Sequence, residues 1–232
     1  MAVAGACDKV IDKAKLIAAH QLECSADDLE FAGGIFSVKG SPDRAVPIAA
    51  LAFAAFTAHN LPDGLEPNLE AQYTYDPPNF SWPFGTHMAI VEIDVETGKI
   101  EVLKYVAVDD CGVQINPLIV EGQVHGGVIQ GLAQALFEEA VYDEDGNLKT
   151  TTLAEYLVPA ACDVPSITTA HTVTPSPTNQ LGVKGIGEAG TIGAAPTIIN
   201  AIIDALSSLG VKHMPMPASP QTVWRAIQSA KK

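Results

Sequence analysis

The chain is organised around Gly182-Val183-Lys184-Gly185-Ile186-Gly187-Glu188-Ala189-Gly190-Thr191-Ile192-Gly193, which holds five glycines and a single carboxylate. Glycines at this density give a backbone that bends tightly and lets another group come close to its peptide units. Downstream, Thr197–Leu209 has the apolar periodicity of a helix, and Pro196 suits the first turn of that helix. A glycine loop that leads into a helix can hold an anion or a cofactor headgroup.

Three interpretations of this glycine loop compete. Gly185–Gly190 fits the pattern G-x-G-x-x-G, but a dinucleotide-binding fingerprint needs a strand before it and the rest of a βαβ unit after it. Here Pro175–Gln180 is a poor strand, little chain follows, and a carboxylate among the glycines would repel a pyrophosphate. The second interpretation is that the glycines only allow close helix packing. We favour the third, in which Glu188 is a chemical carboxylate presented to a bound cofactor or substrate.

Composition restricts the class of protein. The 232 residues suffice for one large domain or two modest ones, and a hydrophobic content of 47% supports a substantial core. The net charge of -14 disfavours partners such as nucleic acid and anionic membrane surfaces. With no leader sequence and no apolar run of membrane length, the chain is expected to be cytoplasmic and not inserted in a membrane. The four cysteines are far apart and the histidines form no H-E-x-x-H motif, so we expect no metal ligated by protein side chains.

The first part of the chain has helix, hairpin and helix signals. Asp8 is placed to cap a helix that runs to about Cys24. Two short alternating runs flank Gly33-Gly34 and predict a hairpin. Ile48–Ala58 is so rich in alanine and phenylalanine that we expect a helix buried on nearly every side.

A segment rich in proline and aromatic residues, 60–86, follows. Only Glu70–Tyr75 within it resembles a strand. The aromatic residues argue for an ordered segment, because a disordered linker would not carry so many. It is either a lid over core surface or a loop that wraps a partner domain or a substrate channel, since long loops in compact domains tend to be functional.

The last part of the chain alternates strand and helix patterns. Met88–Val95 and Lys99–Val108 are the clearest strands. Asp109 and Asp110 follow the second strand, where two acids could be solvated surface residues, a pair of metal ligands or anchors for a bound cofactor. Asn116 and Pro117 predict a helix start. That helix contains four glycines, each costing about 1 kcal/mol relative to alanine, which indicates close approach by another element or a ligand. A turn is expected at Asp143–Asn147 and a short helix from Ser219 to Lys232.

Taken together, these signals predict an α+β fold with helices packed on small mixed or antiparallel sheets, in two lobes split by the loop at 60–86. We divide the chain into a helix–hairpin–helix lobe (1–59), the ordered loop (60–86) and a C-terminal lobe with the glutamate loop (87–232).

Several motifs resemble one known family. In order along the chain these are Tyr75–Phe80, Val108–Gly112, Ile115–Pro117, Glu121–Gly127, His171–Asn179 and Gly182–Gly193. The chain resembles the C-terminal part of the molybdenum-binding large subunit of the xanthine oxidase family, nearest to the aerobic carbon monoxide dehydrogenase type. It is therefore expected to be part of the molybdopterin-binding domain of a molybdenum-dependent oxidoreductase, either as a fragment or as a separately encoded half.

The resemblance implies a cofactor and roles for named residues. The cofactor is molybdenum–molybdopterin cytosine dinucleotide, whose dithiolene holds the metal so that no protein side chain ligates it. Glu188 matches the family's base, which acts on a hydroxyl bound to molybdenum, and the electrons leave through iron–sulfur clusters and FAD on partner subunits. The further positions that match cofactor contacts are Asp109, Gln114, Lys184, Gly185, Ile186 and Gly187.

The departures from the family are equally informative. A family large subunit is several times longer than this chain, so the cofactor is expected to be shared with an N-terminal half. The glycine–phenylalanine loop and the cysteine loop of carbon monoxide dehydrogenases are not found here, so the small substrate could be carbon monoxide, an aldehyde or an N-heterocycle. We expect an oligomeric complex with iron–sulfur and flavin subunits, inactive without the N-terminal half. The alternative is a non-catalytic assembly domain or pseudo-subunit of such a complex.

Overall fold

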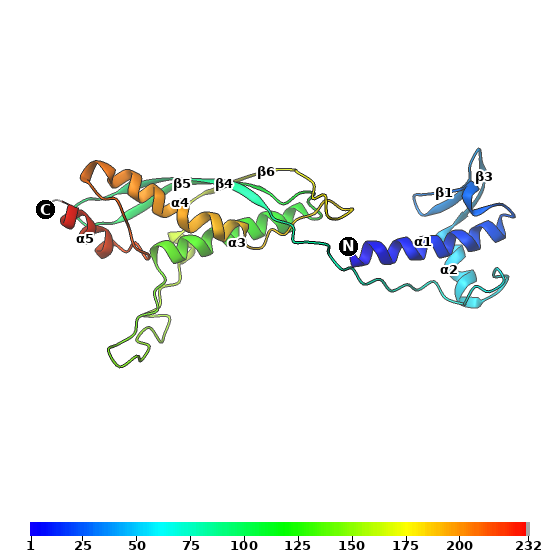
Figure 1. Ribbon diagram of the computed structural model, residues 1–232, viewed down its shortest axis with the longest axis horizontal. Helices are drawn as coiled ribbons and strands as arrows, with labels where there is room; N and C mark the ends of the chain where they lie inside the picture. The colour runs from blue at the N-terminus through cyan, green and yellow to red at the C-terminus, as the bar shows by residue number, and fades with distance from the viewer. Residues whose placement is uncertain (231–232) are drawn as a thin grey trace. The chain divides into compact units, whose positions relative to one another are not determined.

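The structure is a computed structural model that describes residues 1–230, and it confirms the predicted α+β class. The chain forms two compact units, Met1–Pro77 and Pro78–Lys232. Each unit contains one three-stranded sheet and its own helices (Figure 1). The last two residues of the predicted C-terminal helix lie outside the described residues.

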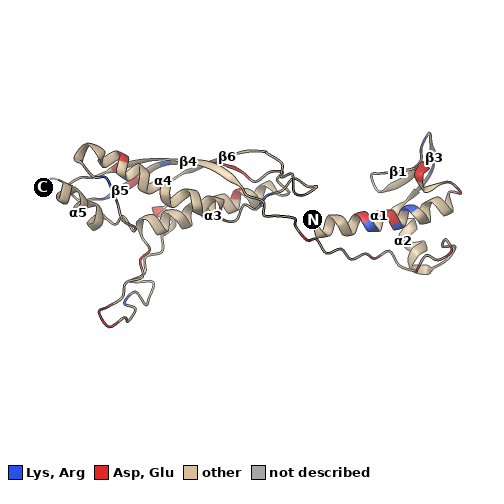
Figure 2. Ribbon diagram, viewed as in Figure 1, with Lys and Arg blue, Asp and Glu red and all other residues tan. Residues whose placement is uncertain are grey.

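Unit 1 packs two helices with an antiparallel sheet. Its elements are α1 (Ala2–Gln21), β1 (Leu29–Ala32), β2 (Ile35–Val38), β3 (Ser41–Pro47) and α2 (Ile48–Thr57). The strand order is β1-β2-β3, and the predicted hairpin is confirmed, with Gly33 and Gly34 at φ values of 57° and 81°. Ile17, Phe36 and Leu51 are fully buried at its core, while α1 carries charges of both signs (Figure 2).

Three predictions for unit 1 were wrong. α1 begins at Ala2, so Asp8 lies inside the helix and does not cap it, because the alanine-rich residues before it continue the helix. α2 is not buried on every side, since Phe53 and Phe56 are 73% and 60% exposed. Glu70–Tyr75 forms no strand, and β3 was not predicted because its exposed proline, aspartate and arginine hide the alternation.

Unit 2 places helices against a mixed sheet. β4 (Phe84–Ile93) pairs antiparallel with β5 (Ile100–Asp110), and β5 pairs in parallel with β6 (Ile167–Thr172). The helices are α3 (Pro117–Leu136), α4 (Ala189–Leu206) and α5 (Pro220–Ala230). The predicted start of α3 is confirmed, since the Asn116 side chain accepts a hydrogen bond from the Ile119 N–H.

α4 begins earlier than the sequence pattern predicted. It starts at Ala189 and not at Thr197, so Pro196 lies inside the helix rather than in its first turn. The glycine-rich stretch is therefore divided: 182–188 is a loop, and 189–193 is helix. The glycines raise the cost of this helical turn, and packing against α3 and β4 offsets it.

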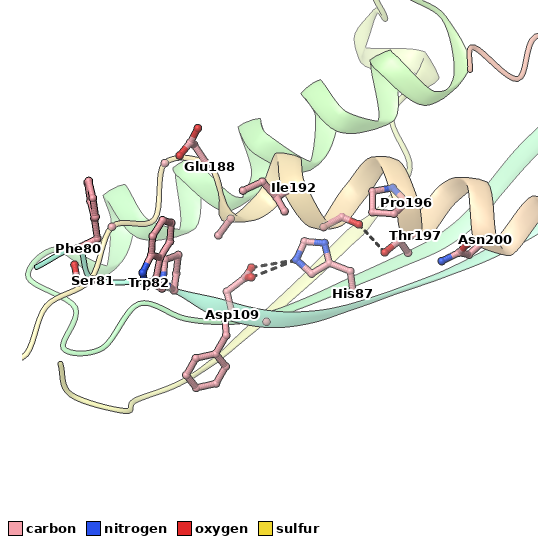
Figure 3. A pocket seen from close by; sticks show the side chains of 17 residues that line it. Phe80, Ser81, Trp82, His87, Asp109, Glu188, Ile192, Pro196, Thr197 and Asn200 are labelled. Atoms are coloured by element: carbon pink, nitrogen blue, oxygen red, sulfur yellow. Dashed lines mark hydrogen bonds and ion pairs between the residues drawn. The ribbon is translucent and has the colours of Figure 1, made fainter. Parts of the chain in front are cut away.

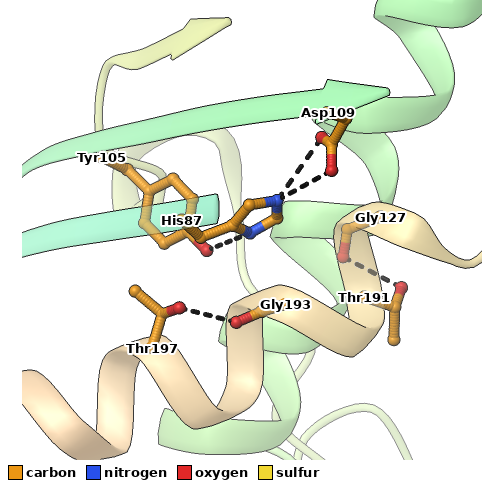
Figure 4. Close-up of polar contacts among 7 residues, drawn as sticks. All are labelled: His87, Tyr105, Asp109, Gly127, Thr191, Gly193 and Thr197. Atoms are coloured by element: carbon orange, nitrogen blue, oxygen red, sulfur yellow. Dashed lines mark hydrogen bonds and ion pairs between the residues drawn. The ribbon is translucent and has the colours of Figure 1, made fainter. Parts of the chain in front are cut away.

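Glycines allow α3 and α4 to lie very close together. A Cβ added to Gly127 would stand 3.0 Å from the Gly190 Cα, and one added to Gly131 would stand 2.8 Å from the Thr191 carbonyl oxygen. Thr191 bridges the same contact by donating from its hydroxyl to the Gly127 carbonyl at 3.0 Å (Figure 4). The close-packing interpretation thus holds for Gly190, whereas Gly185 and Gly187 make no such approach.

The segment Ala189–Leu209 is long and apolar enough to cross a membrane by length and composition alone. The expectation that no run reaches this length was therefore wrong. Core helices of globular domains pass the same test. Ile198, Ile202 and Leu206 of α4 are buried in the core of unit 2 with residues of α3, β5 and α5, and this burial accounts for that part of the apolar sequence.

Candidate functional site

Asp110, at the end of β5, anchors the glycine loop. Its carboxylate is fully buried and accepts hydrogen bonds from the Gly112 N–H (2.9 Å) and the Thr172 hydroxyl (2.8 Å). The Lys184 ammonium completes the set at 3.0 Å, and it also lies 4.5 Å from the centre of the Phe84 ring. The carboxylate thus joins the ends of β5 and β6 to the loop that carries Glu188.

The surroundings of Asp110 favour its charged form. Burial by itself would raise the pKa of Asp110, but hydrogen bonds from Gly112, Thr174, Lys184 and Thr172 outweigh that effect and hold the pKa well below its usual range. An ionised carboxylate with several donors is a stable anchor in the interior.

A cavity of about 620 Å³ opens beside the glycine loop (Figure 3). Glu188 borders it at the N-cap of α4, where its side chain caps no backbone N–H. The loop backbone at Gly185 and Gly187 forms another part of the wall. The aromatic residues Phe80, Trp82 and Phe84 line it as well. This volume lies within the range of small-molecule sites.

Asp109 lines the same cavity and is held by a chain of buried hydrogen bonds (Figure 4). His87 Nε2 lies 3.3 Å and 3.4 Å from the two carboxylate oxygens, and His87 Nδ1 lies 2.8 Å from the Tyr105 hydroxyl. The strand register explains this chain: His87 pairs with Ala107, and Tyr105 and Asp109 are the diagonal neighbours on the same face of β5. Burial first, and the Asp109 charge in addition, raise the pKa of Tyr105 to about 12 against the opposing effect of a hydrogen bond with Thr197.

Asp109 also lines a second cavity, of about 240 Å³. Gln114 and Ile186 line it together with Asp109. Cys111 and His171 add polar atoms, and burial raises the pKa of the Cys111 thiol. Asp109 is therefore a wall residue common to both cavities.

The comparisons with known proteins assign the family. Residues 1–165 match the family described as the molybdopterin cofactor-binding domain. The chain belongs to this family. It is 43% identical over 227 residues to the carbon monoxide dehydrogenase large chain of Hydrogenophaga pseudoflava, covering 98% of this chain and 28% of that protein.

Solved structures agree with this assignment. The Cu,Mo-CO dehydrogenase in its carbon monoxide-reduced state superposes with a TM-score of 0.94 at 41% identity, covering 98% of this chain and 28% of that one. Quinoline 2-oxidoreductase from Pseudomonas putida 86 gives 0.88 at 42% identity, with 94% and 28% covered. The predicted resemblance to the molybdopterin-binding large subunits of the xanthine oxidase family is thus confirmed. The chain spans about 28% of the length of these relatives.

The structure distributes the predicted site residues over both cavities. Asp109, Gly185, Gly187 and Glu188 line the larger one, whereas Asp109, Gln114 and Ile186 line the smaller one. Lys184 is among the lining residues of neither, because its ammonium is bound to Asp110.

Sequence reasoning missed His87, Tyr105 and the anchoring role of Asp110. The only signal for His87 was its place next to the predicted strand that begins at Met88. The residue pattern alone does not distinguish Asp110 from Asp109, and the family resemblance assigns a cofactor contact to Asp109 only. The structure separates them, since one lines the cavities and the other is an internal anchor.

The residues around the larger cavity fit the pterin end of a molybdopterin. A Cβ at Gly185 would meet no atom within 4 Å, so the loop leaves its backbone open on the cavity side. Its charged lining residues are the carboxylates Asp109 and Glu188, which suit N–H donors of a pterin and not a pyrophosphate. In residues 1–230, no group of three or more His, Cys, Asp or Glu side chains is arranged to hold a metal ion.

Proposed function

We propose that this chain supplies one side of a molybdenum hydroxylase active site, in which Glu188 is the catalytic base. The observation that carries the proposal is that one cavity brings together the Glu188 carboxylate, the open backbone at Gly185 and Gly187, and the Asp109 acceptor. The membership in the molybdopterin cofactor-binding family supports the choice of ligand.

Each group has a task in this proposal. When bound, the molybdenum cofactor supplies a two-electron acceptor and the site of oxygen transfer. Asp109 would accept hydrogen bonds from the pterin, the backbone at Gly185 and Gly187 would lie against it, and Lys184 would hold the loop in place through Asp110. Gln114 and Ile186 would contact the same group from the smaller cavity, which Asp109 also lines. The cytosine dinucleotide form is proposed from the resemblance, and its pyrophosphate has to lie away from Asp109 and Glu188.

Glu188 is suited to accept a proton. Its carboxylate caps no backbone N–H of α4, so its oxygens are not engaged in holding the helix start. The Glu188 carbonyl accepts the first helical hydrogen bond from the Ile192 N–H at 3.0 Å, which fixes the backbone. A base on a fixed backbone would take the proton from the attacking hydroxyl at one carboxylate oxygen. Positioned bases increase the reaction rate by about 10²–10⁴-fold.

The rest of the assembly is also proposed. We place the remaining cofactor contacts on an N-terminal half, the FAD and iron–sulfur clusters on partner subunits, and the complex in the cytoplasm as an oligomer. The division into 1–59, 60–86 and 87–232 follows the sequence patterns. The substrate is small, and relatives named for carbon monoxide and quinoline differ too much to choose between a gas and an N-heterocycle.

Elemental and pterin analysis tests the proposal. The chain is purified alone and after co-expression with the N-terminal part of a family large subunit. We expect little molybdenum in the lone chain and close to one equivalent of molybdenum and pterin in the assembled protein, because affinity built from two surfaces is lost when one is absent. An assembled protein without molybdenum would refute the proposal and favour the non-catalytic assembly domain.

A further inference from the structure

Asp109 lines both cavities, and its carboxylate is joined to His87 and, through His87, to Tyr105. We propose that His87 and Tyr105 are positioning residues that keep the Asp109 carboxylate oriented as a hydrogen-bond acceptor for an N–H donor of the bound pterin. This inference rests on the proposed function. It assigns to the buried histidine and tyrosine a role in cofactor retention.

The hydrogen-bond pattern fixes the arrangement of protons. A carboxylate only accepts, so His87 Nε2 carries the hydrogen that faces Asp109. In the neutral ring Nδ1 then accepts from the Tyr105 hydroxyl at 2.8 Å. Tyr105 thereby selects the histidine tautomer that donates to Asp109.

The shared hydrogen bond leaves the carboxylate able to bind a ligand. The distances of 3.3 Å and 3.4 Å place Nε2 almost evenly between the two oxygens of Asp109. A carboxylate offers about four lone-pair sites, so one shared donor leaves acceptor capacity on both oxygens.

Two glycines make room for the side chains of His87 and Asp109. A Cβ on Gly85 would stand 2.3 Å from an Asp109 oxygen, and a Cβ on Gly193 would stand 2.5 Å from His87 Nδ1. Neither position would accept a side chain without displacing the histidine or the carboxylate. β4 and α4 therefore form a slot that fits this one arrangement.

Asp109 depends on the hydrogen bond from His87 because both side chains are buried. The side chains of His87 and Asp109 are only 3% and 5% exposed, and Tyr105 is fully buried. The nearby Lys184 ammonium is bound to Asp110 and does not replace the histidine. Without His87, the Asp109 carboxylate would lose the donor that holds it in this orientation and would be free to turn. Turning removes the acceptor from the ligand.

Variants of the assembled enzyme test the inference. His87→Gln keeps one donor and one acceptor without a titrating ring, and His87→Leu removes both. We expect His87→Leu to retain about tenfold less molybdenum and pterin per chain, or to release them about tenfold faster on dilution, as outer-shell partners typically do. His87→Gln is expected to stay within about twofold of wild type, and the exposed His213→Leu is the matched control.

Each outcome for the His87 and Tyr105 variants either supports or refutes their positioning role. If His87→Leu folds and keeps wild-type cofactor content and release, the inference is overturned. It is overturned equally if folded His87→Gln loses as much as His87→Leu, because hydrogen bonding would then not be the relevant property. If His87→Leu fails to fold, Tyr105→Phe decides: faster cofactor release supports the inference, and unchanged release refutes it. An assembled wild-type protein that contains no cofactor would instead refute the proposed function.

Discussion

The buried Lys184–Asp110 pair should control the stability of unit 2 and the position of the glycine loop. In Lys184→Met, the side chain keeps a similar length but loses the ammonium, and with it both the ion pair to Asp110 and the ammonium's contact with the Phe84 ring. Asp110 then keeps the Gly112 N–H and the Thr172 hydroxyl as donors and loses its only ion-pair partner among the described residues.

The structure sets the size of the effect. Removing one partner of a buried ion pair costs about 3–5 kcal/mol of stability. We expect a loss at the lower end, about 3 kcal/mol, because Gly112 and Thr172 still donate hydrogen bonds to Asp110. For a domain of this size, that corresponds to a melting temperature lower by about 6–12 °C. Because the folded pKa of Asp110 is lowered from 3.8, the pair's stabilisation is fully present above about pH 4 and is lost as the pH falls through the folded pKa.

Thermal unfolding followed by circular dichroism between pH 7 and pH 2 measures both the loss of stability and its dependence on pH. The matched control is Lys212→Met, an exposed lysine in the same unit, which should change stability by less than about 0.5 kcal/mol. The difference between the Lys184 variant and wild type should be largest at neutral pH and shrink in acid. Equal melting temperatures for the two lysine variants at pH 7 would refute the account of the anchor.

Three further results are expected. Gly131→Ala should destabilise the protein by about 1–3 kcal/mol through its clash with α4, whereas Gly126→Ala, which meets open space on the same helix, should stabilise it by about 0.5–1 kcal/mol in denaturant titrations. Tyr105 should ionise near pH 12 in an ultraviolet absorbance titration, with stability lost as the pH rises from 10 towards 12, and Tyr105→Phe should abolish that step. In unit 1, replacing the exposed Phe53 and Phe56 by serine should reduce self-association of the lone chain in sedimentation velocity; unchanged association would exclude α2 as its source.

The sequence predicts those parts of the fold that depend on local signals. The hairpin at Gly33-Gly34, the two long strands and the helix capped by Asn116 all follow from turn residues, alternation and capping. β6 was not predicted, because its pairing with β5 joins segments far apart in the chain and its threonine-rich sequence has no strong alternation. The start of α4 was misplaced because glycine propensity argued against a helix that tertiary packing stabilises.

The sequence likewise predicts some residues of the candidate site and not others. Glu188 and Asp109 could be selected from motifs, and the structure places both on one cavity. His87 and Tyr105 could not, since their contact with Asp109 depends on the register of β4 with β5. A slip of one residue would turn His87 to the opposite face of the sheet. Register across a mixed sheet is set by packing and leaves no short motif.

Glu188→Gln in the assembled enzyme tests the central claim most directly, with turnover and molybdenum content measured on the same sample. The substitution keeps the size of the side chain and its hydrogen-bonding ability but removes the base. We predict that turnover falls by about 10²–10⁴-fold while molybdenum content stays nearly unchanged. Near-normal turnover at full molybdenum content would contradict the assignment of Glu188 as the base.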